Sequence, residues 1–276
     1  KVVGGGYTSY GHSFAINSSG ELYAWGQNHS GQLGLGDTTY RKVPTRVGEA
    51  SDWNTIATGW GIGINEKCAH TLAINSSGEL YAWGYNSSGQ LGLGDTTDRN
   101  VPTKVGTATD WITAACGGRH SLAINSSGEL YAWGDNEYKQ LGLNDTTYRN
   151  TPTRVGEASN WISIAAGGLH SLALNSSGEL YAWGYNNHGQ LGLGDKDPRG
   201  IPTKVGSAAN WVSITCGWLQ SLAHNSLNQL YAWGRNGCGE LGLNDTAERL
   251  SPTLVGTYST ILDVSSGQFH SSVIKL

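Results

Sequence analysis

Methionine is absent from this chain of 276 residues, and charged residues are scarce. Asp, Glu, Lys and Arg make up 14% of the sequence and the formal net charge is −4, so the chain has no basic surface suited to nucleic acid phosphates. We therefore predict that it does not bind nucleic acid. Because it begins at Lys1 without a methionine, we expect a processed protein located outside the cell or at the cell surface.

Long apolar runs are also missing. Glycine and asparagine interrupt every apolar stretch well before the ~18 residues that a membrane-spanning helix needs. We predict a soluble chain that does not span a membrane.

The chain has four cysteines, a number that could form disulfides. Cys116 and Cys216 occupy the same position of two repeats, which should hold them beyond the ~7 Å reach of a disulfide. A bridge between Cys68 and Cys238 stays open on spacing alone. We expect all four to be free or buried thiols.

What the chain does contain is an internal repeat. The stretch Asn75–Asp95, NSSGELYAWGYNSSGQLGLGD, returns almost unchanged from Asn17, Asn125 and Asn175, and in altered form from Asn225. Its YAWG motif begins at positions 23, 81, 131, 181 and 231, so one unit has about 50 residues. We predict a single domain, 1–276, with repeats at approximately 1–48, 49–106, 107–156, 157–206 and 207–256 and a half repeat at 257–276.

Each unit is predicted to contain four short strands. In the third unit these are Trp111–Ala115, His120–Asn125, Glu129–Trp133 and a weak run around Thr153–Val155. Apolar residues alternate within the second and third strands, and SSG between them is typical of a hairpin turn. The fold class is therefore all-β. Four strands every ~50 residues favour a β-propeller, with a solenoid as the other architecture.

An acid and an arginine stand four residues apart in the loop after the third strand of every unit. We interpret them as charge-assisted bonds that hold this loop in place rather than as catalytic groups. The pairs are Asp37 with Arg41, Asp95 with Arg99, Asp145 with Arg149, Asp195 with Arg199, and Asp245 with Arg249.

The consensus GGxHSLAINSSGELYAWGxNxxGQLGLGDxxxRxxPTKVG resembles the repeat of the regulator of chromosome condensation family, whose members are β-propellers. The resemblance covers essentially the whole chain in five complete units. The repeats count five units and a half, with the chain stopping at Leu276 after two strands of a sixth, which gives six blade positions with one shared or incomplete. A familiar member of the family has seven blades, so we expect either a smaller ring or an unfinished blade. An incomplete blade would expose backbone groups to which another strand can add.

A histidine begins the second strand in most units, and Gln220 replaces it in one. A ring of metal ligands would need these side chains to converge within ~2.2 Å of one ion, which separate blades do not allow. We therefore predict hydrogen bonds to the backbone of neighbouring loops. The histidines are His12, His70, His120, His170 and His270.

The copies differ most at two insertions, Gly5–Gly11 and Trp60–Ala69, and at Trp218. Insertions on one face of a repeat array are often its binding surface, and exposed tryptophans are frequent anchors of protein contacts. Trp218 lies in CGWLQS, which is similar to the GWRHT motif of a light-sensing member of the family but has Leu219 and Gln220 in place of its Arg and His. The predicted partner-binding residues are Tyr7, Tyr10, Trp60, Ile62, Asn65, Lys67, Trp218 and Gln220.

No nucleophile with its base, paired carboxylates or phosphate loop stands out from the repeat, so we predict no catalytic residue, no cofactor and no metal. The sequence favours a non-enzymatic scaffold that binds a protein partner or further copies of itself as a homo-oligomer or filament. The alternative function is guanine nucleotide exchange or enzyme inhibition, through the inserted loops, as the resemblance implies.

Overall fold

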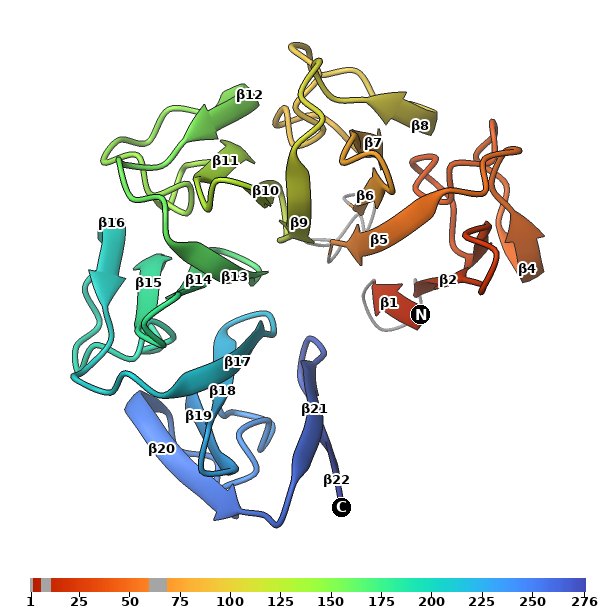
Figure 1. Cartoon of the computed structure of the whole chain (residues 1–276). Helices are drawn as coiled ribbons and strands as arrows, with labels where there is room; N and C mark the ends of the chain where they lie inside the picture. The colour runs from red at the N-terminus through yellow and green to blue at the C-terminus, as the bar shows by residue number, and fades with distance from the viewer. Residues whose placement is uncertain (1, 6–10, 60–68) are drawn as a thin grey trace. The chain divides into compact units, whose positions relative to one another are not determined.

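The computed structural model describes residues 2–5, 11–59 and 69–276. Within these residues the chain forms five four-stranded antiparallel sheets and one two-stranded sheet (Figure 1). Each sheet is a simple meander in which strands that follow one another in the sequence lie side by side. The all-β prediction is therefore confirmed. The chain divides into two compact units, one of Lys1–Asp135 with Thr147–Arg154 and one of Asn136–Thr146 with Val155–Leu276.

The first unit holds three four-stranded sheets. They consist of β1 (Val2–Gly5), β2 (His12–Ile16), β3 (Leu22–Gly26) and β4 (Arg41–Arg46); β5 (Trp53–Thr58), β6 (His70–Asn75), β7 (Leu80–Gly84) and β8 (Arg99–Lys104); and β9 (Trp111–Cys116), β10 (His120–Asn125), β11 (Leu130–Gly134) and β12 (Arg149–Arg154).

The second unit holds two four-stranded sheets and the two-stranded one. They consist of β13 (Trp161–Ala166), β14 (His170–Asn175), β15 (Leu180–Gly184) and β16 (Arg199–Lys204); β17 (Trp211–Cys216), β18 (Gln220–Asn225), β19 (Gln229–Gly234) and β20 (Arg249–Thr257); and β21 (Ile261–Ser266) with β22 (Ser271–Lys275).

The predicted SSG turn joins the second and third strands in the first four sheets, and Ser226, Leu227 and Asn228 take its place in the fifth. In the second sheet, Oδ1 of Asn75 accepts hydrogen bonds from the backbone amides of Ser77, at 3.1 Å, and Glu79, at 2.9 Å. Gly78 follows with a φ of +73°, where a Cβ would approach the carbonyl oxygen of Thr109 to 2.4 Å. The turn therefore uses the asparagine side chain together with a residue at positive φ, which is glycine in four sheets and Asn228, with a φ of +55°, in the fifth.

The fourth strand is present as predicted, but it begins earlier than the sequence indicated. It was expected around Thr153–Val155, whereas β12 begins at Arg149, which pairs with Gly134 beyond a register shift in β11. The strand lies at a sheet edge and contains Pro152, so it has neither two partners nor an alternating pattern. Its sequence signal is weak for that reason.

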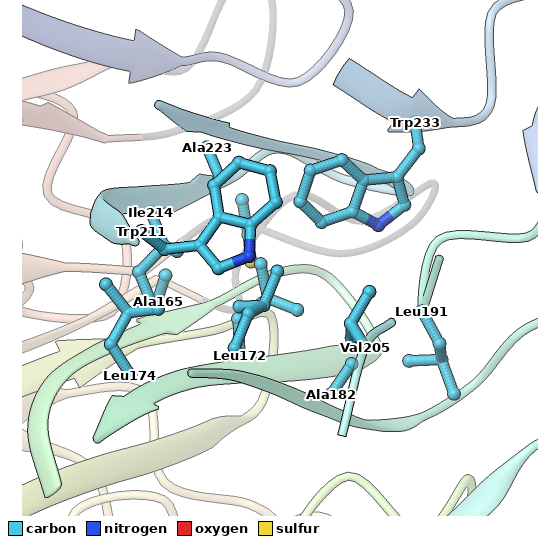
Figure 2. Close-up of a cluster of buried hydrophobic side chains, with 12 residues drawn as sticks. Ala165, Leu172, Leu174, Ala182, Leu191, Val205, Trp211, Ile214, Ala223 and Trp233 are labelled. Atoms are coloured by element: carbon cyan, nitrogen blue, oxygen red, sulfur yellow. The ribbon is translucent and has the colours of Figure 1, made fainter. Parts of the chain in front are cut away.

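Within each compact unit, the hydrophobic core lies between successive sheets. In the second unit, Leu172, Ala182, Leu191 and Val205 of one sheet and its loops face Trp233 of the next, as Figure 2 shows. Strand β18 belongs to a sheet that has another sheet of this unit on either side, and both faces of the strand are buried. The alternation that the sequence predicts thus separates two buried faces rather than a buried face from an exposed one.

Candidate partner-binding site

The loop after the third strand is an ordered part of each sheet. The side-chain amide of Asn86 donates to the carbonyl oxygens of Asp95, at 3.1 Å, and Thr97, at 3.0 Å, and its Oδ1 accepts from the amide of Leu91 at 2.9 Å. Nη2 of Arg99 lies 2.6 Å from Oδ2 of Asp95. The backbone amide of Thr97 and this guanidinium lower the pKa of Asp95. The predicted acid–arginine bonds are confirmed at Asp37–Arg41, Asp95–Arg99, Asp195–Arg199 and Asp245–Arg249.

The YAWG tryptophan joins neighbouring sheets through a hydrogen bond and close packing. The indole Nε1 of Trp233 donates to the carbonyl oxygen of Gln190 in the preceding loop at 2.9 Å, and Oγ of Ser221 donates to the same oxygen at 2.8 Å. The indole lies against Gly192, where a Cβ would come within 2.8 Å of Nε1. The same bond, 2.8–2.9 Å long, is made by Trp83, Trp133 and Trp183.

His70 and His170, which begin second strands, are buried and bond to serine side chains, not to loop backbone as predicted. His12 and His120 are buried too, whereas His270 is exposed. Nε2 of His70 lies 2.9 Å from Oγ of Ser121, whose proton goes to the carbonyl oxygen of Gln90 at 2.8 Å. His70 must therefore donate from Nε2 as a neutral ring. Burial, with His120 and His12 nearby, lowers its pKa to about 3.

Six of the eight predicted partner-binding residues lie outside the described residues, namely Tyr7, Tyr10, Trp60, Ile62, Asn65 and Lys67. Their role stays a prediction. Trp218 is half-buried, and its ring lies against Gly168 in the preceding sheet. Gln220 has no exposed surface, and its side-chain amide donates to the carbonyl oxygens of Gly267 and Gln268 at 3.0 and 3.2 Å. It therefore offers no atom to a partner in this structure.

The two-stranded sheet presents a different kind of surface, which the sequence predicted only as an unfinished blade. Within the described residues β22 pairs with β21 alone, and Ser272 and Ile274 on it are exposed. A cavity of about 330 Å³ lies between this sheet and the one before it. Its walls include Leu222, Leu230, Glu240, Gly242, Val255 and Val273. This volume is in the range of small-ligand sites.

Other predicted features can be placed within the described part of the chain. Cys116 and Cys216 are buried free thiols and Cys238 is an exposed one, as predicted, while Cys68 lies outside it. No group of three or more metal-ligating side chains occurs among the described residues. The described residues contain no helix that is long and apolar enough to cross a membrane.

Residues 62–275 match the family described as the RCC1-like domain, and residues 19–64 match the regulator of chromosome condensation (RCC1) repeat. The chain belongs to the RCC1-like domain family. Its fold is the β-propeller of this family, as the sequence predicted.

Solved structures of the RCC1 type superpose on nearly the whole chain. Human WBSCR16 gives a TM-score of 0.84 with 26% identity and covers 96% of this chain and 69% of its own. Yeast RCC1 (Prp20), solved bound to Kap60, gives a TM-score of 0.79 with 26% identity, covering 96% of this chain and 64% of its own. That complex shows an RCC1-like propeller binding another protein.

In sequence, the ultraviolet-B receptor UVR8 of Arabidopsis thaliana is 42% identical over 114 residues. The match covers 39% of this chain and 24% of the receptor, so the chain spans a minor part of that relative.

Proposed function

We propose that this RCC1-like chain is a non-enzymatic scaffold that binds protein by adding a strand to the open edge of β22, and that further copies of the chain are one such partner. The observation that carries the proposal is the two-stranded sheet. The other five sheets have four strands, but β22 has a neighbour on only one side within the described residues.

The chemistry of this edge suits strand addition. A strand with one unpaired side presents a row of backbone donors and acceptors that another strand can satisfy. The exposed side chains of β22 include Ile274, with 59% of its surface accessible, so the edge carries apolar surface as well. Lys275 is the charged residue of β22, and its Nζ atom lies 4.5 Å from the centroid of the Tyr258 ring.

Light scattering across a wide concentration range tests the proposal. We expect the mass of the purified chain to rise with concentration, because a head-to-tail contact that does not close on itself continues to grow. The double substitution Ser272→Lys with Ile274→Lys should reduce this rise, since lysines on an edge strand oppose pairing. Val43→Lys is the matched control, because Val43 is 65% exposed on another edge strand, β4.

A wild-type chain that stays monomeric at every concentration would overturn self-assembly through β22. An equal effect of the β4 control would show that charge in general, and not this edge, limits association. An extracellular or cell-surface location, and exchange of guanine nucleotide or enzyme inhibition through the inserted loops, stay secondary predictions that this experiment does not address.

A further inference from the structure

We infer that a groove between the fourth and fifth four-stranded sheets binds a neutral saccharide. The groove has a volume of about 580 Å³, which lies within the range of about 300–1,000 Å³ that small-ligand sites occupy. Its walls come from the segment 204–211, which joins β16 to β17, and from the hairpin of β18 and β19, with Ser251 and Pro252 of β20 beside them. This site is separate from the edge of β22 and does not depend on strand addition there.

Hydrogen bonds fix both walls of the groove. The segment 204–211 is held at its end by the amide of Trp211, which donates to the carbonyl oxygen of Gly178 at 3.1 Å. The hairpin is joined to the same segment by the amide of Ser226, which donates to the carbonyl oxygen of Asn210 at 2.9 Å. The groove is therefore formed before a ligand enters, and binding needs little further ordering of the chain.

Aromatic and aliphatic side chains give the groove an apolar surface. The rings of Trp211 and Tyr231 meet edge to face, with centroids 5.1 Å apart and planes at 82°. Trp211 is 8% exposed and belongs to the core cluster of Figure 2, so the core holds this surface in place. Leu193 and Pro252 line the groove as well, together with Leu227, which is 63% exposed.

The residues of this groove lack the carboxylates that other repeats carry at the same positions. Two positions of the linking segment and one of the hairpin are Ser207, Asn210 and Gln229. The same positions of the preceding repeats are Glu49, Asp52 and Glu79, then Thr107, Asp110 and Glu129, then Glu157, Asn160 and Glu179. Between the fourth and fifth sheets these positions therefore offer hydroxyl and amide groups in place of negative charge.

The change at Gln229 provides a hydrogen-bond donor. Its Oε1 accepts from Nδ2 of Asn225 at 2.8 Å and from the hydroxyl of Tyr231 at 3.3 Å, the same two bonds that a glutamate carboxylate accepts in the preceding sheet. No described residue accepts a hydrogen bond from Nε2 of Gln229. Both N–H groups of that amide thus remain for a ligand in the groove, which Gln229 lines.

The groove offers no unpaired charge to a ligand. Among the described residues that line it, Lys204 alone is charged, and its Nζ lies 2.5 Å from Oε1 of Glu179. An ionic ligand would lose hydration in the groove without gaining an opposite charge, which costs free energy. The site therefore favours a neutral ligand.

A saccharide ring has the two kinds of group that the groove requires. Its hydroxyls both donate and accept, which suits the side chains of Asn210, Gln229 and Ser251. Its C–H groups form an apolar face that suits the surface of Leu227 and Tyr231. A few amides and hydroxyls around an apolar surface are typical of a site for a polar but uncharged small molecule.

Saturation-transfer-difference NMR on the full chain tests the inference with the methyl glycosides of glucose, galactose, mannose and N-acetylglucosamine. We expect at least one of them to bind saturably, with a dissociation constant on the order of 1 mM, as the small size of a monosaccharide allows. Methyl glucuronide, which carries a carboxylate, should show no saturable binding. Binding of none of the neutral glycosides, or equal binding of methyl glucuronide, would overturn the inference. Self-association is judged separately by light scattering.

One pair of variants exchanges the residue types at a single repeat position. Gln229→Glu removes the free donor and adds a carboxylate, which should weaken sugar binding by about tenfold or more. Glu129→Gln makes the reverse change in the third sheet and should leave binding unchanged. Because four sheets carry glutamate at this position, Gln229→Glu is compatible with the fold, and urea unfolding checks this. Equal weakening by both variants would contradict a sugar in this groove.

A second pair of variants and a spectroscopic signal locate the bound sugar. Ser207→Glu puts a carboxylate on a lining residue, whereas Ala209→Glu puts the same charge on an exposed residue of the same segment that does not line the groove. The first should weaken binding by about tenfold and the second by much less. In two-dimensional NMR spectra, the side-chain amide signal of Gln229, identified by its loss in Gln229→Glu, should shift as sugar is added. An unshifted signal at saturation would place the sugar elsewhere and overturn this site.

Discussion

Single histidines in this fold join neighbouring sheets while remaining uncharged. The ring of His70 donates to Ser121, whose hydroxyl donates onward to the carbonyl oxygen of Gln90. A protonated ring would gain a charge in a site with no exposed surface, which is why burial is the main cause of its lowered pKa. Gln220 provides the same kind of bridge in another repeat with an amide that does not titrate.

This difference predicts a dependence of stability on pH. The pKa of His70 is about 3 in the folded chain and about 6.5 when unfolded, so its neutral form is fully present above pH 6.5. As the pH falls from there towards 3, the unfolded state binds the proton first and stability is lost. The loss per buried histidine is at most about 1.4 kcal/mol per pH unit. Urea unfolding at pH 7, 6, 5 and 4.5 should therefore show a shallower loss for His70→Gln than for the wild type.

The lowered pKa values of carboxylates such as Asp95 add their own loss in acid, but they are present in both proteins and cancel in the comparison. His29→Gln removes an exposed histidine and controls for the substitution as such. Identical slopes for His70→Gln and the wild type would show that the buried ring does not resist protonation.

At the scale of the element, the YAWG tryptophan of one sheet stabilises the loop of the sheet before it. Trp133 is fully buried and donates to Gln90, whereas Trp25, at the same position of the first sheet, is only half-buried. Trp133→Phe removes the indole N–H and part of the packing, which we expect to lower the free energy of unfolding by about 1–3 kcal/mol. Trp25→Phe, the matched control, should cost clearly less in the same urea titration. Equal costs would mean that the inter-sheet bond adds nothing.

The accuracy with which the sequence predicts a strand or loop depends on how local its signal is. The β10 and β11 strands and the turn between them were predicted within one residue, because alternation and SSG act locally. The β12 strand was misplaced because an edge strand containing Pro152 carries little pattern. The asparagine after YAWG, Asn86, was overlooked as the organiser of the loop, since its bonds to Asp95 and Thr97 reach across nine and eleven residues.

At the candidate site, the sequence predicted the two-stranded sheet but not the cavity beside it. That residues 257–276 repeat the first two strands of a unit is visible in the sequence, and the structure forms them as β21 and β22. The cavity is not visible, because it is formed by residues such as Leu222 and Val255 that look like ordinary core positions of their own repeat. Gln220 was assigned to a binding surface because it breaks the repeat, yet the break is a buried substitution for histidine.

At the scale of the whole molecule, the two-stranded sheet should be the least stable of the described sheets. Strand β22 has one neighbour and exposed side chains at Ser272, Ile274 and Lys275, whereas β18 lies between two strands and is buried throughout. Amide protection depends on local opening, which costs least where few buried contacts must break. In hydrogen exchange followed by mass spectrometry, residues 261–275 should therefore exchange well before residues 211–234.

The same measurement connects stability to binding. A strand added to β22 gives its outward amides partners, so self-association at high protein concentration should slow exchange in residues 261–275 and leave residues 99–116 unchanged. The Ser272→Lys with Ile274→Lys variant, at the same concentration, should show much less of this slowing. Uniform slowing over the whole chain would indicate that association stabilises the fold in general, and that result would contradict a strand held at this edge.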